Sequence, residues 1–169
     1  MKKLFIALTV FVASLALPAA ALADSTMAFS PLLTGTVAIS PVGNSQQNQK
    51  WTLMASGTEA PLGDFNYQSD LVVHMQNGVP ATAEGQGVFT GTGSSTGDSI
   101  SFNLKLTFGM PTTSDPNTYP FTGTFSLSGG TGRFQGAHGG GAINPGGANP
   151  TAGTFFGAWD GSFAAKKAL

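Results

Sequence analysis

Residues 98–108 read DSISFNLKLTF, and this stretch decides the fold. Every second residue in it is apolar, namely Ile100, Phe102, Leu104, Leu106 and Phe108. The residues between them are polar or charged. Because successive side chains of a β-strand point to opposite faces, the pattern predicts a strand with one face in the core and the other in water.

The same alternation recurs along the chain. It places Phe65, Tyr67, Leu71, Val73 and Met75 on one face of a second strand, and Phe121, Phe125 and Leu127 on one face of a third. In residues 154–163, TFFGAWDGSF, large rings alternate with glycines that leave room for rings from neighbouring strands. Shorter candidates at 34–40, 50–57, 82–90 and 133–143 bring the total to about eight strands, and no helical segment is predicted after residue 23.

Only 9% of the residues are charged, and this bears on whether the strands form an open sandwich or a closed barrel. The edges of an open sandwich need lysines or prolines for protection, whereas a closed barrel has no edges. We therefore predict an all-β fold, a single eight-stranded antiparallel β-barrel. An outer-membrane barrel shows the same alternation, but its outward face must be apolar, and the many glycines here are too small for a lipid-facing band.

The N-terminus has the order of segments of a secretory signal peptide. Lys2 and Lys3 precede an apolar run that is interrupted by Pro18 and ends in the small-residue pattern of residues 21–23, ALA. We predict a signal peptide over residues 1–23 and a barrel domain over residues 24–169, secreted or periplasmic. The apolar run is short for a membrane anchor, so we expect no membrane span in the mature chain.

Composition excludes several classes of partner. The chain has no cysteine, which excludes disulfides and thiolate metal sites. Without Lys2 and Lys3, five basic residues stand against eight acidic ones, a net charge of about −3. This balance offers no basic face for nucleic acid.

Residues 128–141, SGGTGRFQGAHGGG, hold the single arginine of the chain among seven glycines. A dinucleotide-binding loop needs a helix directly behind its glycines, and no helix-forming run follows here. We therefore interpret Gly129, Gly130, Gly132, Arg133 and Phe134 as a structural turn between two strands, and we expect no cofactor.

Two segments carry a resemblance to a known group of proteins. Residues 129–139, GGTGRFQGAHG, resemble the GGTG(R/K)F-x-x-A-x-G segment of allene oxide cyclases, dirigent proteins and secreted bacterial proteins with the same barrel. Residues 57–65, GTEAPLGDF, are similar to the G-x-A-x-x-LG-x-F segment of the bacterial relatives. The resemblance covers roughly residues 57–163 and implies an eight-stranded barrel with a mostly apolar central cavity; the plant members are trimers, so a homo-oligomer is one expected partner.

The resemblance assigns no catalytic residue. The cyclases carry a motif close to Y-E-x-N-E on the first strand, whereas residues 33–40, LTGTVAIS, contain no carboxylate. The ligand cavity is expected to be lined by Phe65, Tyr67, Phe102, Leu104, Phe125, Phe155 and Trp159. These residues favour a non-enzymatic barrel that binds a small apolar ligand. The alternatives are an isomerase or cyclase of the allene oxide cyclase or dirigent type, and a structural envelope protein that associates through its β-surface.

Each of the remaining polar residues that could form a functional site also has a simpler, structural interpretation. Arg133 either clamps a ligand carboxylate or, as we prefer, has a structural role in which it pairs with a nearby acid or covers apolar surface with its stem. Glu59 and Asp64 are expected to be solvated, and His74 and His138 match no metal-ligand spacing, so no metal is expected. Residues 42–49 and 139–153 are interpreted as polar, mobile loops, one of which rims the mouth of the barrel and admits a ligand.

Overall fold

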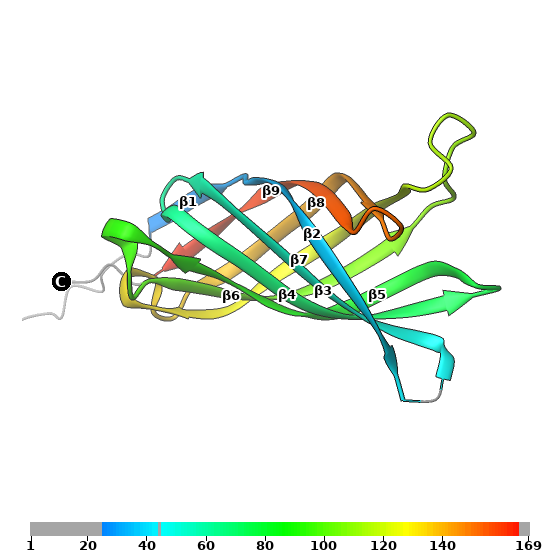
Figure 1. The fold of residues 1–169 in the computed structure, drawn as a ribbon. Helices are drawn as coiled ribbons and strands as arrows, with labels where there is room; N and C mark the ends of the chain where they lie inside the picture. The colour runs from blue at the N-terminus through cyan, green and yellow to red at the C-terminus, as the bar shows by residue number, and fades with distance from the viewer. Residues whose placement is uncertain (1–24, 44, 166–169) are drawn as a thin grey trace, which may run out of the picture.

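The computed structural model describes residues 25–43 and 45–165, so the predicted signal peptide lies outside the described residues. The described chain is almost entirely β-structure with two short 3₁₀ turns, as expected (Figure 1). In chain order the elements are β1 (Ser25–Phe29), β2 (Leu32–Val42), β3 (Ser45–Glu59), β4 (Gly63–Gln76), β5 (Val79–Gly91), η1 (Gly93–Ser95), β6 (Ser99–Phe108), β7 (Tyr119–Thr131), η2 (Gly132–Phe134), β8 (His138–Asn149) and β9 (Thr154–Ala165).

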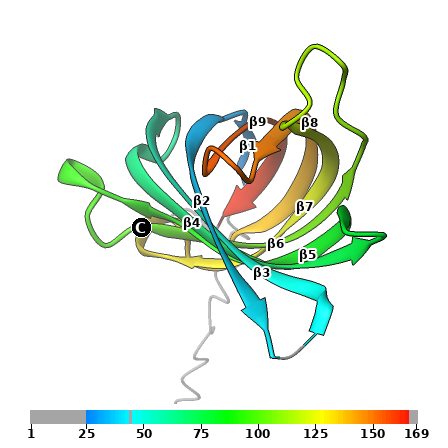
Figure 2. The ribbon, with the colours of Figure 1, turned by 45° about the vertical axis from the view of Figure 1, so that its right-hand side comes forward.

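The sheet closes on itself through β9. Strands β2 to β8 each pair with the next in antiparallel order, and β9 pairs with β8 on one side. On its other side β9 pairs with β2 through one half and with β1 through the other, so β1 and β2 share one strand position that is interrupted at Ser30 and Pro31. The result is a closed antiparallel barrel of eight strand positions, which confirms the predicted fold (Figure 2).

The core lies inside the barrel, where rings rest on glycines of other strands. A Cβ atom added at Gly161 would lie 2.7 Å from Cζ of Phe125, and one at Gly57 would lie 3.0 Å from Cζ of Phe65. The glycines of β9 thus make room for rings from another strand, as the sequence predicted. The alternating pattern is explained by this packing, because a ring on one strand fits the space left by a glycine on another.

Three boundaries predicted from the sequence are wrong. Residues 133–143 are not one strand, because Arg133 lies in η2 and β8 begins at His138. Residues 139–149, interpreted as part of a mobile loop, form most of β8, because the rings of Phe121 and Phe156 pack against Gly146 and Gly147. Likewise β3 begins at Ser45 inside the predicted polar connection, and its Gln49 pairs with Pro41 of β2.

One end of the barrel, which we call the corner end, is formed by η1, η2 and residues 60–62 between β3 and β4 (Figure 1). The two corners share a sequence pattern, GTGSSTG in residues 91–97 and GTGRFQG in residues 130–136, and a backbone: φ is 57° at both Gly93 and Gly132. Phe134 and Leu62 are buried there, and the ring of Phe134 lies 5.7 Å from that of Phe163. The corner end is therefore sealed by apolar side chains.

The opposite end, which we call the mouth, is formed by the β2–β3 and β4–β5 hairpins and by the connections β6–β7 and β8–β9. In Figure 2 these connections spread apart around the end of the barrel. Within residues 25–43 and 45–165, no helix has the length and apolar character needed to cross a membrane.

Candidate functional site

The residues predicted to line a ligand cavity are all brought together inside the barrel, and all are buried. Their exposed fractions do not exceed 4%: Phe65, Tyr67, Phe102, Leu104, Phe125, Phe155 and Trp159. The rings of five of them form one connected group, with ring centroids 4.6 Å apart for Phe125 and Trp159 and 5.1 Å apart for Phe102 and Trp159. At this level the barrel is occupied by its own side chains, and a ligand contact of these residues stays a prediction.

One polar pair lies among these rings. The hydroxyls of Tyr67 and Ser69 are 2.9 Å apart, and Ser69 is 1% exposed. Burial raises the pKa of the Tyr67 phenol above its ordinary value, although the hydrogen bond to Ser69 opposes the shift. The phenol therefore stays protonated at neutral pH and satisfies the serine inside the core.

Above the packed interior, three aromatic residues form a roof that faces the mouth. The rings of Trp51 and Phe108 are 5.5 Å apart, and those of Phe108 and Phe121 are 5.6 Å apart. Trp51 is 1% exposed, and its Nε1 donates to Oε1 of Gln49 at 2.9 Å. The roof separates the filled part of the barrel from the hollow part.

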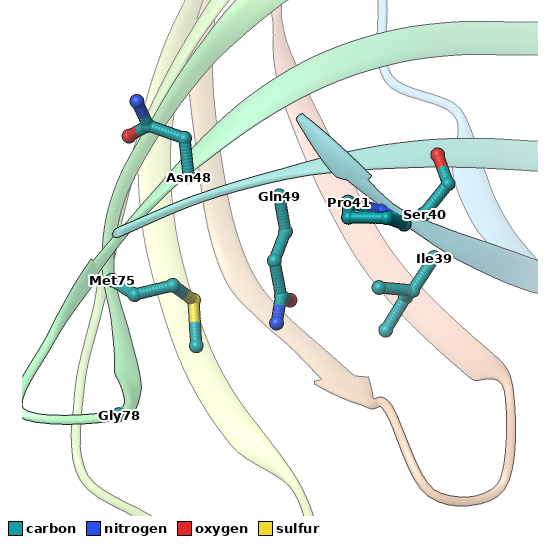
Figure 3. A pocket seen from close by; sticks show the side chains of 7 residues that line it. All are labelled: Ile39, Ser40, Pro41, Asn48, Gln49, Met75 and Gly78. Carbon is teal, nitrogen blue, oxygen red and sulfur yellow. The ribbon is translucent and has the colours of Figure 1, made fainter. Parts of the chain in front are cut away.

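Two adjoining hollows lie at the mouth beyond this roof. The first has a volume of about 410 Å³ and is lined by Ile39, Ser40, Pro41, Asn48, Gln49, Met75 and Gly78 (Figure 3). The second has a volume of about 250 Å³ and is lined by Ile39, Gln49, Trp51, Met75, Gly78, Pro80, Pro116, Asn117, Tyr119, Pro150 and Thr151. The hollows share Ile39, Gln49, Met75 and Gly78, so we treat them as one candidate site, the mouth site.

The strand alternation decides which side chains enter the mouth site. Figure 3 shows Ile39, Gln49 and Met75 directed into the same space, whereas Ser40 and Asn48 point away from it. Ile39 continues the inward row of Val37 and keeps 39% of its surface exposed. The site thus presents apolar surface that the barrel itself does not cover.

The lining of the mouth site is neutral. No lining residue is an aspartate, glutamate, lysine, arginine or histidine. Its polar groups are amides and hydroxyls, among them Gln49 and Tyr119. A site of this kind binds through apolar contact and a small number of hydrogen bonds.

A larger hollow of about 550 Å³ lies on the outer wall over β4, β5 and β6. Its side chains are mainly polar, and its carboxylate is already occupied, because Asp70 accepts from Thr52 at 2.6 Å and pairs with Lys50 at 3.2 Å. The mouth site combines apolar side chains with polar groups that a ligand can reach, so it is the better candidate for an apolar ligand.

The sequence interpretation missed the residues of the mouth site. Gln49 was placed in a loop, and Ile39, Trp51 and Tyr119 were not singled out. The signal that identifies them is the alternation itself, because the inward row of β3 continues from Leu53 through Trp51 to Gln49. The expectation that a polar segment rims the mouth is confirmed in position, since Asn48, Gln49, Pro150 and Thr151 line the hollows.

The predicted structural turn forms the η2 corner, and its arginine is paired within the chain. The backbone N–H of Arg133 donates to Oδ1 of Asp98 at 2.9 Å, and its Nε donates to Oδ2 at 2.6 Å. Nη2 reaches Oγ of Ser95 at 3.2 Å, and the guanidinium lies 5.5 Å from the centroid of the Phe134 ring. The backbone N–H of Arg133, together with its guanidinium, holds the pKa of the Asp98 carboxyl below its ordinary value.

The glycines of this turn serve the corner in different ways. Gly129 and Gly132 have φ values of 139° and 57°, which favour glycine. Gly130 has no such φ, but a Cβ atom there would lie 2.6 Å from the carbonyl oxygen of Phe134. The segment is a tight corner between strands, with Phe134 buried beneath it.

The other polar residues considered as functional candidates form hydrogen bonds within the chain. Glu59 accepts from the backbone N–H of Ser30 at 3.0 Å, and Asp64 accepts from Thr58 at 2.6 Å, both at exposed positions. Nδ1 of His74 lies 2.8 Å from Oδ1 of Asn48, and Nδ1 of His138 lies 3.2 Å from the carbonyl oxygen of Gly136. In the part of the chain that the structure describes, no three metal-binding side chains form a cluster.

Comparison with known proteins gives no further information about this site. The chain matches no family model, no curated protein and no solved structure.

Proposed function

We propose that this protein is a binding barrel that holds a small, mainly apolar molecule at the mouth site. The observation that supports this most is a neutral, partly apolar hollow over an aromatic roof. The first hollow alone, at about 410 Å³, falls within the range of volumes that small-molecule sites have. The predicted signal peptide would place this binding outside the cell or in the periplasm.

The rest of the barrel supports the proposal by holding the site in place. The roof residue Trp51 packs on Phe108, which packs on Phe121, and the interior below is filled with rings in contact. A site that is already formed before binding loses less conformational entropy when the ligand arrives. The packed interior therefore acts as the rigid support of the mouth rather than as the binding chamber.

The two tryptophans allow a direct test, because Trp51 lines the mouth site and Trp159 lies in the packed interior. Binding is measured from the fluorescence of N-phenyl-1-naphthylamine, a neutral apolar probe, and is expected to saturate. Its position is measured with 1-bromooctane, which quenches indole only on close contact. We expect quenching in Trp159→Phe, which retains Trp51, and little quenching in Trp51→Phe.

Two outcomes would contradict the proposal. If the probe fluorescence does not rise and saturate, the protein is not a binding barrel for such molecules. If the probe binds but bromooctane quenches only Trp159, the ligand enters the interior, and the mouth is not the site.

A second candidate function rests on the resemblance to allene oxide cyclases and dirigent proteins. This candidate requires the filled interior to open around Tyr67, whose protonated phenol could then donate a hydrogen bond to a reactive intermediate. An assay of allene oxide cyclisation tests this candidate through product stereochemistry. Racemic product at the uncatalysed rate would exclude that substrate class.

A further inference from the structure

We infer that the ligand of the mouth site is uncharged and carries a hydrogen-bond acceptor, such as a ketone or ester oxygen, which the side-chain amide of Gln49 binds. This inference rests on the proposed function, and it names the chemical class of the ligand. It follows from the orientation of one amide and from the neutral lining around it.

The orientation of the Gln49 amide is fixed by Trp51. The indole Nε1–H can only donate, and Trp51 is 1% exposed, so this N–H needs an acceptor from the protein. Oε1 of Gln49 lies 2.9 Å from it. The reverse orientation would place two donors against each other, so the amide must present its oxygen to the indole and its Nε2 to the other side.

The Nε2 group faces the mouth site. Gln49 lines both hollows, and Figure 3 shows its amide directed into the space beside Ile39 and Met75. Within residues 25–43 and 45–165, the hydrogen bond found for this side chain uses the oxygen alone. Two N–H donors are therefore available in an otherwise apolar part of the site, and a ligand that enters there satisfies them only with an acceptor.

The lining disfavours a charged ligand. A carboxylate or ammonium group that enters the site gives up part of its hydration, and none of the lining side chains of either hollow carries an opposite charge. A neutral carbonyl loses less hydration and gains the bond to Gln49. The apolar body of the ligand then covers Ile39 and Met75, and the roof beneath it is Trp51.

Three naphthalenes of closely similar shape separate the effect of a hydrogen-bond acceptor on affinity from the effect of a charge. They are 2-ethylnaphthalene, 2-acetylnaphthalene and 2-naphthoate at pH 7. Each is measured by displacement of N-phenyl-1-naphthylamine from the purified protein. We expect 2-acetylnaphthalene to bind about tenfold more tightly than 2-ethylnaphthalene, which lacks the acceptor. We expect 2-naphthoate, which has acceptors but also a charge, to bind more weakly than 2-acetylnaphthalene.

The variant Gln49→Glu tests the residue. Its carboxylate can still accept from Trp51, but it replaces the Nε2 donors with an acceptor. We expect the tenfold advantage of the ketone over the hydrocarbon to disappear, while the affinity for the hydrocarbon changes by less than about threefold. The matched control is Gln68→Glu, which makes the same change on an exposed glutamine of the outer wall that lines neither hollow of the mouth site.

The outcomes distinguish this inference from the proposed function. Equal binding of the ketone and the hydrocarbon, tightest binding of the naphthoate, or a ketone advantage that survives in Gln49→Glu would each overturn the inference while leaving a binding barrel. A loss of the advantage in Gln68→Glu as well would also overturn it, because the effect would then be one of net charge. If neither the probe nor any naphthalene binds, both the inference and the proposed function are wrong.

Discussion

The two ends of this barrel are built from the same strands but finish in opposite ways. At the corner end, inward side chains continue to the last turn, and Leu62 and Phe134 are buried there with 0% and 2% exposure. At the mouth, the inward rows continue past the roof into Ile39, Gln49 and Met75, which remain partly exposed. One end is filled and the other is hollow.

The difference lies in the connections rather than in the strands. Each corner is a short G-T-G turn that buries one side chain at the end of the barrel. This side chain is Ser95 in η1 and Phe134 in η2. At the mouth the hairpins and longer connections contribute prolines, amides and Tyr119 around the rim. Under the function proposed above, stability would depend mainly on the corner end and binding on the mouth.

The largest effect is expected for Phe134→Ala at the corner end. The ring is 2% exposed and packs on Phe163, so its removal leaves a cavity that the corner backbone cannot fill. We expect a loss of about 3–5 kcal/mol in the free energy of unfolding, measured by urea denaturation. Leu32→Ala is the control, since that side chain is 75% exposed on the outer wall. A loss for Phe134→Ala no larger than that for Leu32→Ala would show that the corner end is not sealed by this ring.

The next effect compares two glycines with the same backbone conformation. Gly93 and Gly132 both have a φ of 57°, so alanine at either position is strained by about 1 kcal/mol. At Gly93 an added Cβ atom has no neighbour within 4 Å, whereas at Gly132 it would collide with Oδ1 of Asp98. We expect Gly132→Ala to lower the free energy of unfolding by about 2–3 kcal/mol and Gly93→Ala by about 1 kcal/mol. Equal losses in thermal or urea melts would mean that the contact with Asp98 adds nothing.

Much of the corner end was predictable from the sequence, because it depends on local signals. The period-2 alternation predicts the strands, and the glycines around Arg133 and Phe134 predict a sharp turn. The partner of Arg133 was not predictable, since Asp98 is 35 residues away and meets it only when β6 and β7 pair. Residues 144–149 of strand β8 were not predicted as strand for a related reason, because their Gly, Asn and Pro residues are poor strand formers that are held by the rings of Phe121 and Phe156.

The mouth was less predictable, because a hollow is a property of several strands together. The sequence shows that Phe102 and Trp159 face inward, but whether they leave a cavity or fill it depends on volumes contributed by all eight strand positions. Gln49 was assigned to a loop because its neighbours are polar, although pairing with Pro41 extends the strand through it. Continuing each inward row beyond its last apolar residue is the step that would have found the mouth site.

A pH-dependent effect is expected at the corner end for Asp98→Asn. The lowered pKa of Asp98 means that its carboxylate stabilises the fold above the pKa of about 3.9 that it has in the unfolded chain, and that this contribution is lost as the pH falls through the folded value. We expect the variant to be about 1–2 kcal/mol less stable than the parent at pH 7, and the difference to shrink below about pH 4. Urea melts at pH 7 and pH 3 measure it. A difference that is the same at both pH values would assign the loss to packing instead of charge.

The smallest effect on stability is expected at the mouth, where the effect on binding is the readout. Ile39 is 39% exposed, and Leu32 on the same strand is 75% exposed on the outer wall, so Ile39→Ser and Leu32→Ser make matched changes at the two faces of β2. Each should change the free energy of unfolding by no more than about 0.5 kcal/mol, since neither side chain is packed in the core.

Ile39→Ser removes apolar surface that the ligand would cover, so the dissociation constant of N-phenyl-1-naphthylamine should rise about three- to tenfold. Leu32→Ser should leave that constant unchanged, because its side chain lies outside the barrel. Equal weakening in both variants would indicate nonspecific adsorption to apolar surface, and unchanged binding in Ile39→Ser would remove the mouth from consideration as the binding end of the barrel.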